Sequence, residues 1–154
     1  MTTTTTLKER LRADLTAAIK GRDELRAATL RMALTAITNE EVAGAVARSL
    51  SEAETVTVLT REMKKRREAA EAFAGAGRVE QAARERAEGE VLADYLPAQL
   101  TDEELSALVA DAIAETGAAG PKAMGLVMKV LTPKIAGRAE GGRVAAAVKS
   151  ALVG

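Results

Sequence analysis

Pro97 most constrains the fold of this chain, because it separates two regions with different patterns of helix signals. Proline lacks a backbone donor and pushes Leu96 out of the helical region, so a helix that runs toward Tyr95 must end there. Long alanine-rich stretches precede this point, and closely spaced helix stops and starts follow it. The sequence therefore predicts a disordered start over 1–6, an N-terminal helical domain over 7–95 and a C-terminal helical domain over 96–154.

Three capping boxes predict where helices begin. In this motif a Ser or Thr side chain and a Glu three residues later each bond to the other's backbone amide. The pairs are Thr6 with Glu9, Ser51 with Glu54, and Thr101 with Glu104. Asp23 is a further N-cap candidate, and its helix is expected to run to about Val46. Gly21, Gly75 and Gly117 predict helix ends.

Apolar residues at helical spacing predict which faces are buried. Leu7, Leu11, Leu15 and Ile19 form a stripe on the first helix. The longest predicted helix follows Ser51, and its expected inward residues are Val56, Leu59, Met63, Ala70 and Phe73. After Pro121, which suits a first helical position, Pro133 and Gly137 are expected to impose a turn before a last short helix.

The composition favours an all-α fold. The 47% hydrophobic content is dominated by alanine, with one Phe, one Tyr and no Trp, whereas sheets favour β-branched and aromatic residues. We expect an N-terminal multi-helix bundle or hairpin array, followed by a small C-terminal three-helix bundle.

Missing residue types restrict the possible chemistry. The chain has no Cys and no His, which removes thiolate ligands, the cysteine nucleophile and the usual general base. We predict no catalytic residue, no metal site and no cofactor. No run of about 18 apolar residues is present, so we predict no membrane partner and a cytoplasmic location.

Charge is segregated in the last third of the chain, although the net charge is zero. Residues 95–119 contain five acids and no basic residue, and residues 120–154 contain six basic residues and only Glu140 as an acid. Five of the basic residues lie at predicted helix starts and the turn. The predicted RNA-binding residues are Lys122, Lys129, Lys134, Arg138 and Arg143.

Two other charged clusters have a structural and a functional interpretation. The run Lys64, Lys65, Arg66 and Arg67 is a possible secondary basic contact, but Glu68 and Glu71 follow at the four-residue spacing of helical ion pairs, which favours a solvated face. Asp102, Glu103 and Glu104 could hold a metal or act as acid and base, as in a carboxylate-based hydrolase. Capping and the helix dipole explain all three acids and are the favoured interpretation.

The order of the C-terminal motifs resembles the GatB/YqeY family, whose members share a small helical domain with the tail of the B subunit of the tRNA-dependent aspartyl/glutamyl amidotransferase. The motifs are Tyr95-Leu96-Pro97, Met124-Gly125 with Met128, and Gly137-Arg138-Ala139. Upstream segments around Thr29 and Lys64 resemble free-standing members. Glu140 stands where aspartate is usual, and Ala145 and Ala146 stand where asparagine is usual.

This resemblance implies a non-catalytic tRNA-binding or tRNA-enzyme adaptor, because the amidotransferase tail contacts tRNA. The implied partners are tRNA and an aminoacyl-tRNA-handling enzyme. The family is associated with translation and with carbon-nitrogen ligation using glutamine as amide donor, a reaction of the full enzyme. Since aromatic residues are nearly absent, RNA would be recognised by phosphate and shape. The alternative is a helical protein-protein interaction module that binds no RNA.

Overall fold

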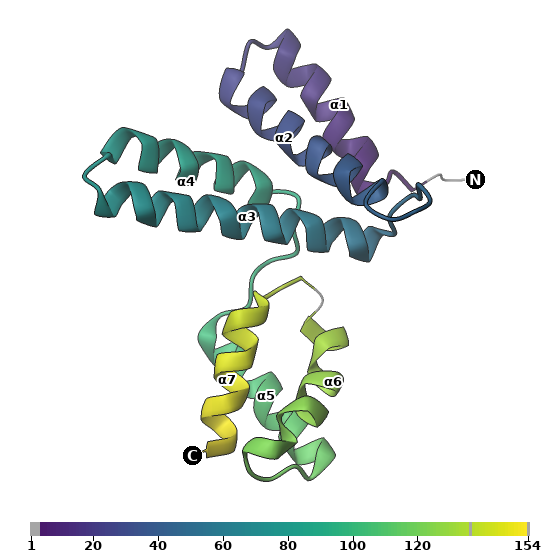
Figure 1. The fold of residues 1–154 in the computed structure, drawn as a ribbon, viewed down its shortest axis with the longest axis vertical. Coiled ribbons are helices and arrows are strands. Elements are labelled where there is room, and N and C mark those ends of the chain that lie inside the picture. The colour runs from purple at the N-terminus through teal and green to yellow at the C-terminus, as the bar shows by residue number, and fades with distance from the viewer. Residues whose placement is uncertain (1–3, 136, 154) are drawn as a thin grey trace. The chain divides into compact units, whose positions relative to one another are not determined.

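The computed structural model describes residues 4–135 and 137–153, and every regular element in them is a helix (Figure 1). The predicted all-α fold is confirmed. The first four helices are α1 (Leu7–Lys20), α2 (Glu24–Glu41), α3 (Glu52–Gly75) and α4 (Val79–Ala93). They are followed by α5 (Asp102–Thr116), the short 3₁₀ helix η1 (Pro121–Ala123), α6 (Met124–Ile135) and α7 (Gly141–Val153).

The chain forms two compact units that meet at Pro97. We call Met1–Leu96 the N-terminal unit and Pro97–Gly154 the C-terminal unit. Each unit has its own hydrophobic core of buried residues. Residues 1–3 of the predicted disordered start lie outside the described residues, and Thr6 is the N-cap of α1.

Two helical hairpins make up the N-terminal unit. Helices α1 and α2 pack together, and α3 packs along α4 (Figure 1). All four helices contribute to one core, which includes the fully buried Leu11, Leu30, Ile37, Leu59 and Leu92. Burying an apolar side chain of this size contributes about 1.5–3 kcal/mol, so packing rather than intrinsic helix propensity stabilises the unit.

The predicted capping residues are confirmed at every position. Thr6, Ser51 and Thr101 each form a complete capping box with the glutamate three residues later, and Asp23 accepts a hydrogen bond from the Arg26 amide. Gly117 ends α5 in the left-handed conformation, with φ of 65°, which glycine adopts without a side-chain clash.

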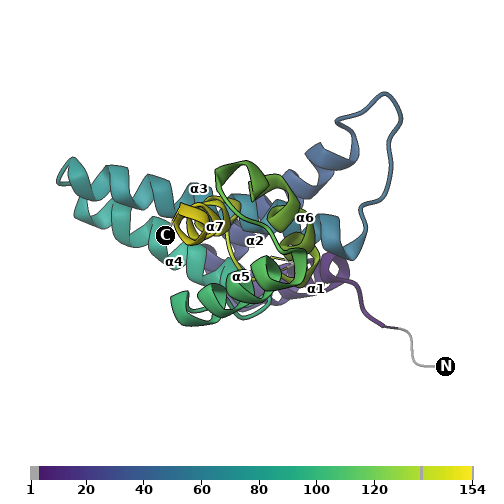
Figure 2. The same ribbon diagram turned by 90° about the horizontal axis from the view of Figure 1, so that it is seen from below.

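The second helix is shorter than predicted. It ends at Glu41 rather than near Val46, and a loop then connects α2 to α3 (Figure 2). The Arg48 amide closes this loop by donating to the Glu41 carbonyl. In this loop Val46 is 78% exposed.

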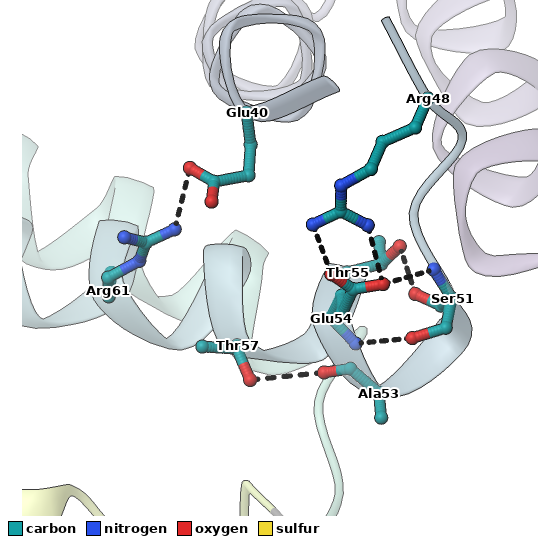
Figure 3. Close-up of polar contacts among 8 residues, drawn as sticks. All are labelled: Glu40, Arg48, Ser51, Ala53, Glu54, Thr55, Thr57 and Arg61. Atoms are coloured by element: carbon teal, nitrogen blue, oxygen red, sulfur yellow. Dashed lines mark hydrogen bonds and ion pairs between the residues drawn. The ribbon is translucent and has the colours of Figure 1, made fainter. Parts of the chain in front are cut away.

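Ion pairs fix both ends of the α2–α3 loop (Figure 3). Both terminal nitrogens of Arg48 donate to the Glu54 carboxylate, which also accepts from the Ser51 amide, and Arg61 pairs with Glu40. Hydrogen bonding by Arg48, followed by that of the Ser51 amide, lowers the pKa of Glu54 to about 2. The loop thus begins and ends at defined positions although its middle is exposed.

Polar residues occupy two inward positions of α3 that the apolar pattern did not identify. Thr55 and Glu62 are buried, whereas the predicted inward residues Val56, Met63 and Phe73 are only partly buried. Thr55 satisfies its hydroxyl by donating to the Ser51 carbonyl at 2.9 Å. On α1, Ile19 is exposed and Ala18 takes the buried position, so the predicted stripe is correct only for its N-terminal part.

The C-terminal unit consists of α5, α6, α7 and η1 around a second core. The residues with least exposure are Val109, Ala112, Val127, Leu131 and Val148. Pro121 begins η1, as its position predicted. Pro133 does not end α6, which continues to Ile135. Proline has no amide hydrogen, so the carbonyl four residues earlier loses its helical hydrogen bond. Because Pro133 lies in the exposed last turn, water can bond to that carbonyl instead. The turn follows at Gly137, where φ is 82°.

Candidate nucleic-acid interface

The five predicted RNA-binding residues all lie in the C-terminal unit, on three helices and one turn. Lys122 is in η1, Lys129 and Lys134 are in α6, Arg138 is in the turn before α7, and Arg143 is in the first turns of α7. Their side chains are held by different contacts, so they are not equivalent candidates for binding phosphate.

Two of these cations are paired with acids of α5. Lys134 Nζ lies 2.9 Å from Glu115 Oε2, and an Arg143 terminal nitrogen lies 2.9 Å from Asp102 Oδ1. The charge segregation seen along the sequence is therefore partly reversed in space, because α5 packs beside α6 and α7. A phosphate would therefore compete with these carboxylates for Lys134 and Arg143.

Lys122 and Lys129 are exposed and form no ion pair with any residue in 4–135 or 137–153. Leu126 lies between them in sequence and is 51% exposed. Leu126 and Lys129 lie three residues apart in α6, the spacing of neighbours on one helical face, and Lys122 lies in η1, which leads directly into α6. Val127, Leu131 and Ile135 are the buried residues of α6. We call Lys122, Leu126 and Lys129 the basic face of α6, a name that includes the η1 turn before the helix.

Arg138 belongs to a hydrogen-bonded junction between the segment after Pro97 and the turn before α7. The Leu100 amide donates to the Arg138 carbonyl at 2.7 Å, and Gln99 Nε2 donates to the Gly137 carbonyl at 3.0 Å. In return, Arg138 Nε donates to the Ala98 carbonyl at 3.2 Å. The segment that follows the Tyr95-Leu96-Pro97 motif thus contacts the Gly137-Arg138-Ala139 motif and holds the start of α5 against the start of α7.

The guanidinium of Arg138 retains binding capacity despite this junction. Its hydrogen bond to Ala98 uses Nε, and its terminal nitrogens have no hydrogen-bond partner within the described residues. Its charge also acts on Glu104: the pKa of Glu104 is lowered first by the Thr101 amide, then by the Thr101 hydroxyl, with a smaller effect of Arg138. Arg138 is therefore a third candidate for phosphate contact.

The basic run on α3 is largely neutralised by carboxylates. Lys64 pairs with Glu68 at 3.8 Å, Lys65 with Glu62 at 3.2 Å and Arg67 with Glu71 at 4.0 Å. These pairs give structural support to the solvated-face interpretation. The three residues remain poorer candidates for RNA contact than the basic face of α6.

Arg66, the fourth residue of the run, lies between α3 and α4. It is within 4 Å of Glu62 on its own helix and of Glu85 and Glu88 on α4. Its side chain is 21% exposed, and the side chains of Glu62 and Glu88 are each 11% exposed. Arg66 thus compensates buried carboxylates at the α3–α4 interface, a role that local spacing to Glu68 and Glu71 did not reveal.

Sequence analysis also missed a polar cluster at the end of the N-terminal unit. The Tyr95 hydroxyl donates to Asp14 and accepts from Arg26, and the Arg10 guanidinium lies 5.2 Å from the ring centroid. Burial, followed by the bond to Asp14, raises the pKa of Tyr95, and the hydrogen bond to Tyr95 raises the pKa of Arg26. The cluster fixes the last turn before Pro97.

The acids at the start of α5 have structural contacts. Glu104 completes the capping box and Asp102 pairs with Arg143. Within the part of the chain that the structure describes, no group of three acidic side chains could hold a metal ion. The described helices also include none whose length and hydropathy would suit a bilayer crossing.

The fold and the site together define a two-unit helical protein with a basic helical face in its second unit. The chain belongs to the family of Yqey-like proteins, whose family model matches residues 8–152. The resemblance based on the Tyr95-Leu96-Pro97, Met124-Gly125 and Gly137-Arg138-Ala139 motifs is thereby confirmed. A search among curated proteins found no match.

Proposed function

We propose that the C-terminal unit binds the phosphate backbone of a structured RNA, with tRNA as the ligand, and that the chain acts as a non-catalytic tRNA-binding or tRNA-enzyme adaptor. The observation that carries this proposal is the basic face of α6. There, Lys122 and Lys129 are exposed and have no carboxylate partner among the described residues. Arg138, whose terminal nitrogens have no hydrogen-bond partner within the described residues, adds a third cation.

The chemistry of this face suits phosphate rather than bases. Lysine is a compact point charge that neutralises phosphate without reading sequence, and the chain has only Tyr95 and Phe73 as aromatic residues. Tyr95 is buried in the N-terminal unit and cannot stack on a base. Recognition by charge and shape fits a folded RNA, and the resemblance to the amidotransferase tail supports tRNA in particular.

We expect Lys129→Glu to weaken tRNA binding about tenfold at about 0.1 M salt, because the change removes one phosphate contact and adds a repulsive charge. The measurement is fluorescence anisotropy of labelled, unfractionated tRNA titrated with the full chain. Lys129 is exposed and forms no ion pair within the described residues, so its replacement should leave helicity unchanged.

Lys64→Glu is the matched control, because Lys64 is also an exposed helical lysine but lies 3.8 Å from Glu68 on α3. Both variants change the net charge by two. The proposal predicts an affinity within about twofold of wild type for the control. Equal losses in the two variants would show that net charge, not the basic face of α6, determines binding.

A second candidate function is protein-protein contact through the α2–α3 loop. Val42 and Val46 are 57% and 78% exposed there. The Arg48 guanidinium in the same loop already donates hydrogen bonds to the Glu54 carboxylate. An exposed apolar loop with fixed ends suits an apolar pocket on a protein and offers nothing to phosphate. Failure of wild-type protein to bind tRNA would leave this as the better-supported function.

A further inference from the structure

We propose that Glu115 is a specificity-determining residue of the RNA interface, because it holds Lys134 and competes with phosphate for it. The inference rests on the proposed function, in which the cations of the C-terminal unit meet an RNA backbone. Asp102 acts in the same way on Arg143. A ligand gains the full contact of Lys134 or Arg143 only where its phosphates displace these carboxylates, which disfavours weakly charged polyanions.

The geometry of the Lys134–Glu115 pair permits this exchange. The two charged atoms are 2.9 Å apart, and the Lys134 and Glu115 side chains are 44% and 59% exposed. Exposed ion pairs of this kind are weak, because water and salt screen them. Phosphate can therefore replace the carboxylate without unfolding any element.

The position of Glu115 supports a role other than helix stability. It lies in the last turn of α5, which ends at Thr116, where the helix dipole disfavours a negative charge. The helix has acids in its first turn, where they are stabilising, and no basic residue in its last turn. The Glu115 carboxylate therefore does not stabilise α5, and the favourable contact that the structure shows for it is the ion pair with Lys134.

Arg143 is less available than Lys134. One of its terminal nitrogens donates both to Asp102 and to the Leu100 carbonyl, at 2.9 and 3.0 Å. Removing Asp102 would leave the backbone bond in place and would also change the first turn of α5. Glu115 is therefore the residue at which carboxylate competition is best tested.

The test compares Glu115→Gln with Asp111→Asn. Both changes neutralise an acid of α5, but Asp111 is exposed and has no ion-pair partner among residues 4–135 and 137–153, so its loss frees no cation. We expect Glu115→Gln to tighten tRNA binding about fivefold at about 0.1 M salt and to steepen the salt slope by roughly one. Asp111→Asn should stay within about twofold of wild type in affinity.

A second readout separates this inference from the proposed function. The salt concentration that elutes each full-length variant from heparin-agarose measures exposed cationic charge without RNA. Later elution of Glu115→Gln than of Asp111→Asn supports the competition, even if no variant binds tRNA and the proposed function fails. Equal elution and equal tRNA affinity of the two variants, or no retention of either, would overturn it.

Discussion

We expect Arg66→Met to lower the free energy of unfolding of the N-terminal unit by about 2 kcal/mol, because the change removes a cation that three carboxylates share. Arg66 lies within 4 Å of Glu62, Glu85 and Glu88, and Glu62 and Glu88 are buried. Glu62 keeps Lys65 as a partner and Glu88 keeps Arg84, so the loss is smaller than for a fully unpaired buried charge. Methionine keeps most of the volume of the side chain, so the loss is electrostatic rather than a cavity. About 2 kcal/mol is still a large part of the stability of a small domain.

Tyr95 offers a direct measurement of this effect. It is the single tyrosine of a chain without tryptophan, and it is buried in the core of the N-terminal unit. Its fluorescence during urea unfolding therefore follows the unit that contains Arg66. The midpoint should fall, and Glu85→Gln in the Arg66→Met background should recover part of the loss, because Glu85 forms no ion pair with another cation among the described residues.

Lys64→Met is the matched control on the same helix. Lys64 lies 3.8 Å from Glu68, and their side chains are 49% and 59% exposed. Exposed pairs contribute about 0–1 kcal/mol, so the unfolding midpoint should move little. If Arg66→Met and Lys64→Met behaved alike, the α3 basic run would be a uniform solvated face, and the interfacial role of Arg66 would be wrong.

The affinity of the chain for tRNA should fall about 20- to 40-fold between about 50 and 200 mM salt. This corresponds to a logarithmic slope with a magnitude of about two to three, since each of three available cations releases roughly 0.7–0.9 counterions. The three are Lys122, Lys129 and Arg138, because Lys134 and Arg143 are paired with acids of α5. The measurement is tRNA anisotropy at four or more salt concentrations.

The salt slope of tRNA binding distinguishes three available cations, as the structure indicates, from the five that the sequence pattern predicts. Five free cations, as the sequence alone suggests, would give a magnitude of roughly 3.5–4.5. A value in that range would mean that RNA displaces both Glu115 and Asp102 fully. A slope near zero would exclude phosphate contacts as the source of affinity.

Local signals predicted the helix starts. Thr6, Asp23, Ser51 and Thr101 cap helices as expected, because a cap depends on residues within four positions of each other. The break at Pro97 also follows from local backbone chemistry. Helix ends without such signals were less predictable, and α2 ends at Glu41 rather than near Val46.

Contacts between distant residues set the features that the sequence did not reveal. Glu62 on α3 shares the Arg66 guanidinium with Glu85 and Glu88 on α4. Because this cluster spans two helices, local spacing along the sequence does not reveal it. Likewise, Arg143 meets Asp102 only because α5 and α7 pack together. The segregated charges were visible in the sequence, but their partial neutralisation depends on tertiary structure.

Lysine footprinting tests most directly whether the basic face of α6 contacts RNA. The full chain is acetylated under limiting conditions with and without saturating tRNA, and the modification of each lysine is measured by mass spectrometry. We predict that tRNA protects Lys122 and Lys129, while Lys20 and Lys64, which are exposed in the N-terminal unit, react at the same rate in both samples. Unchanged reactivity of Lys122 and Lys129 in a sample that binds tRNA would contradict the account.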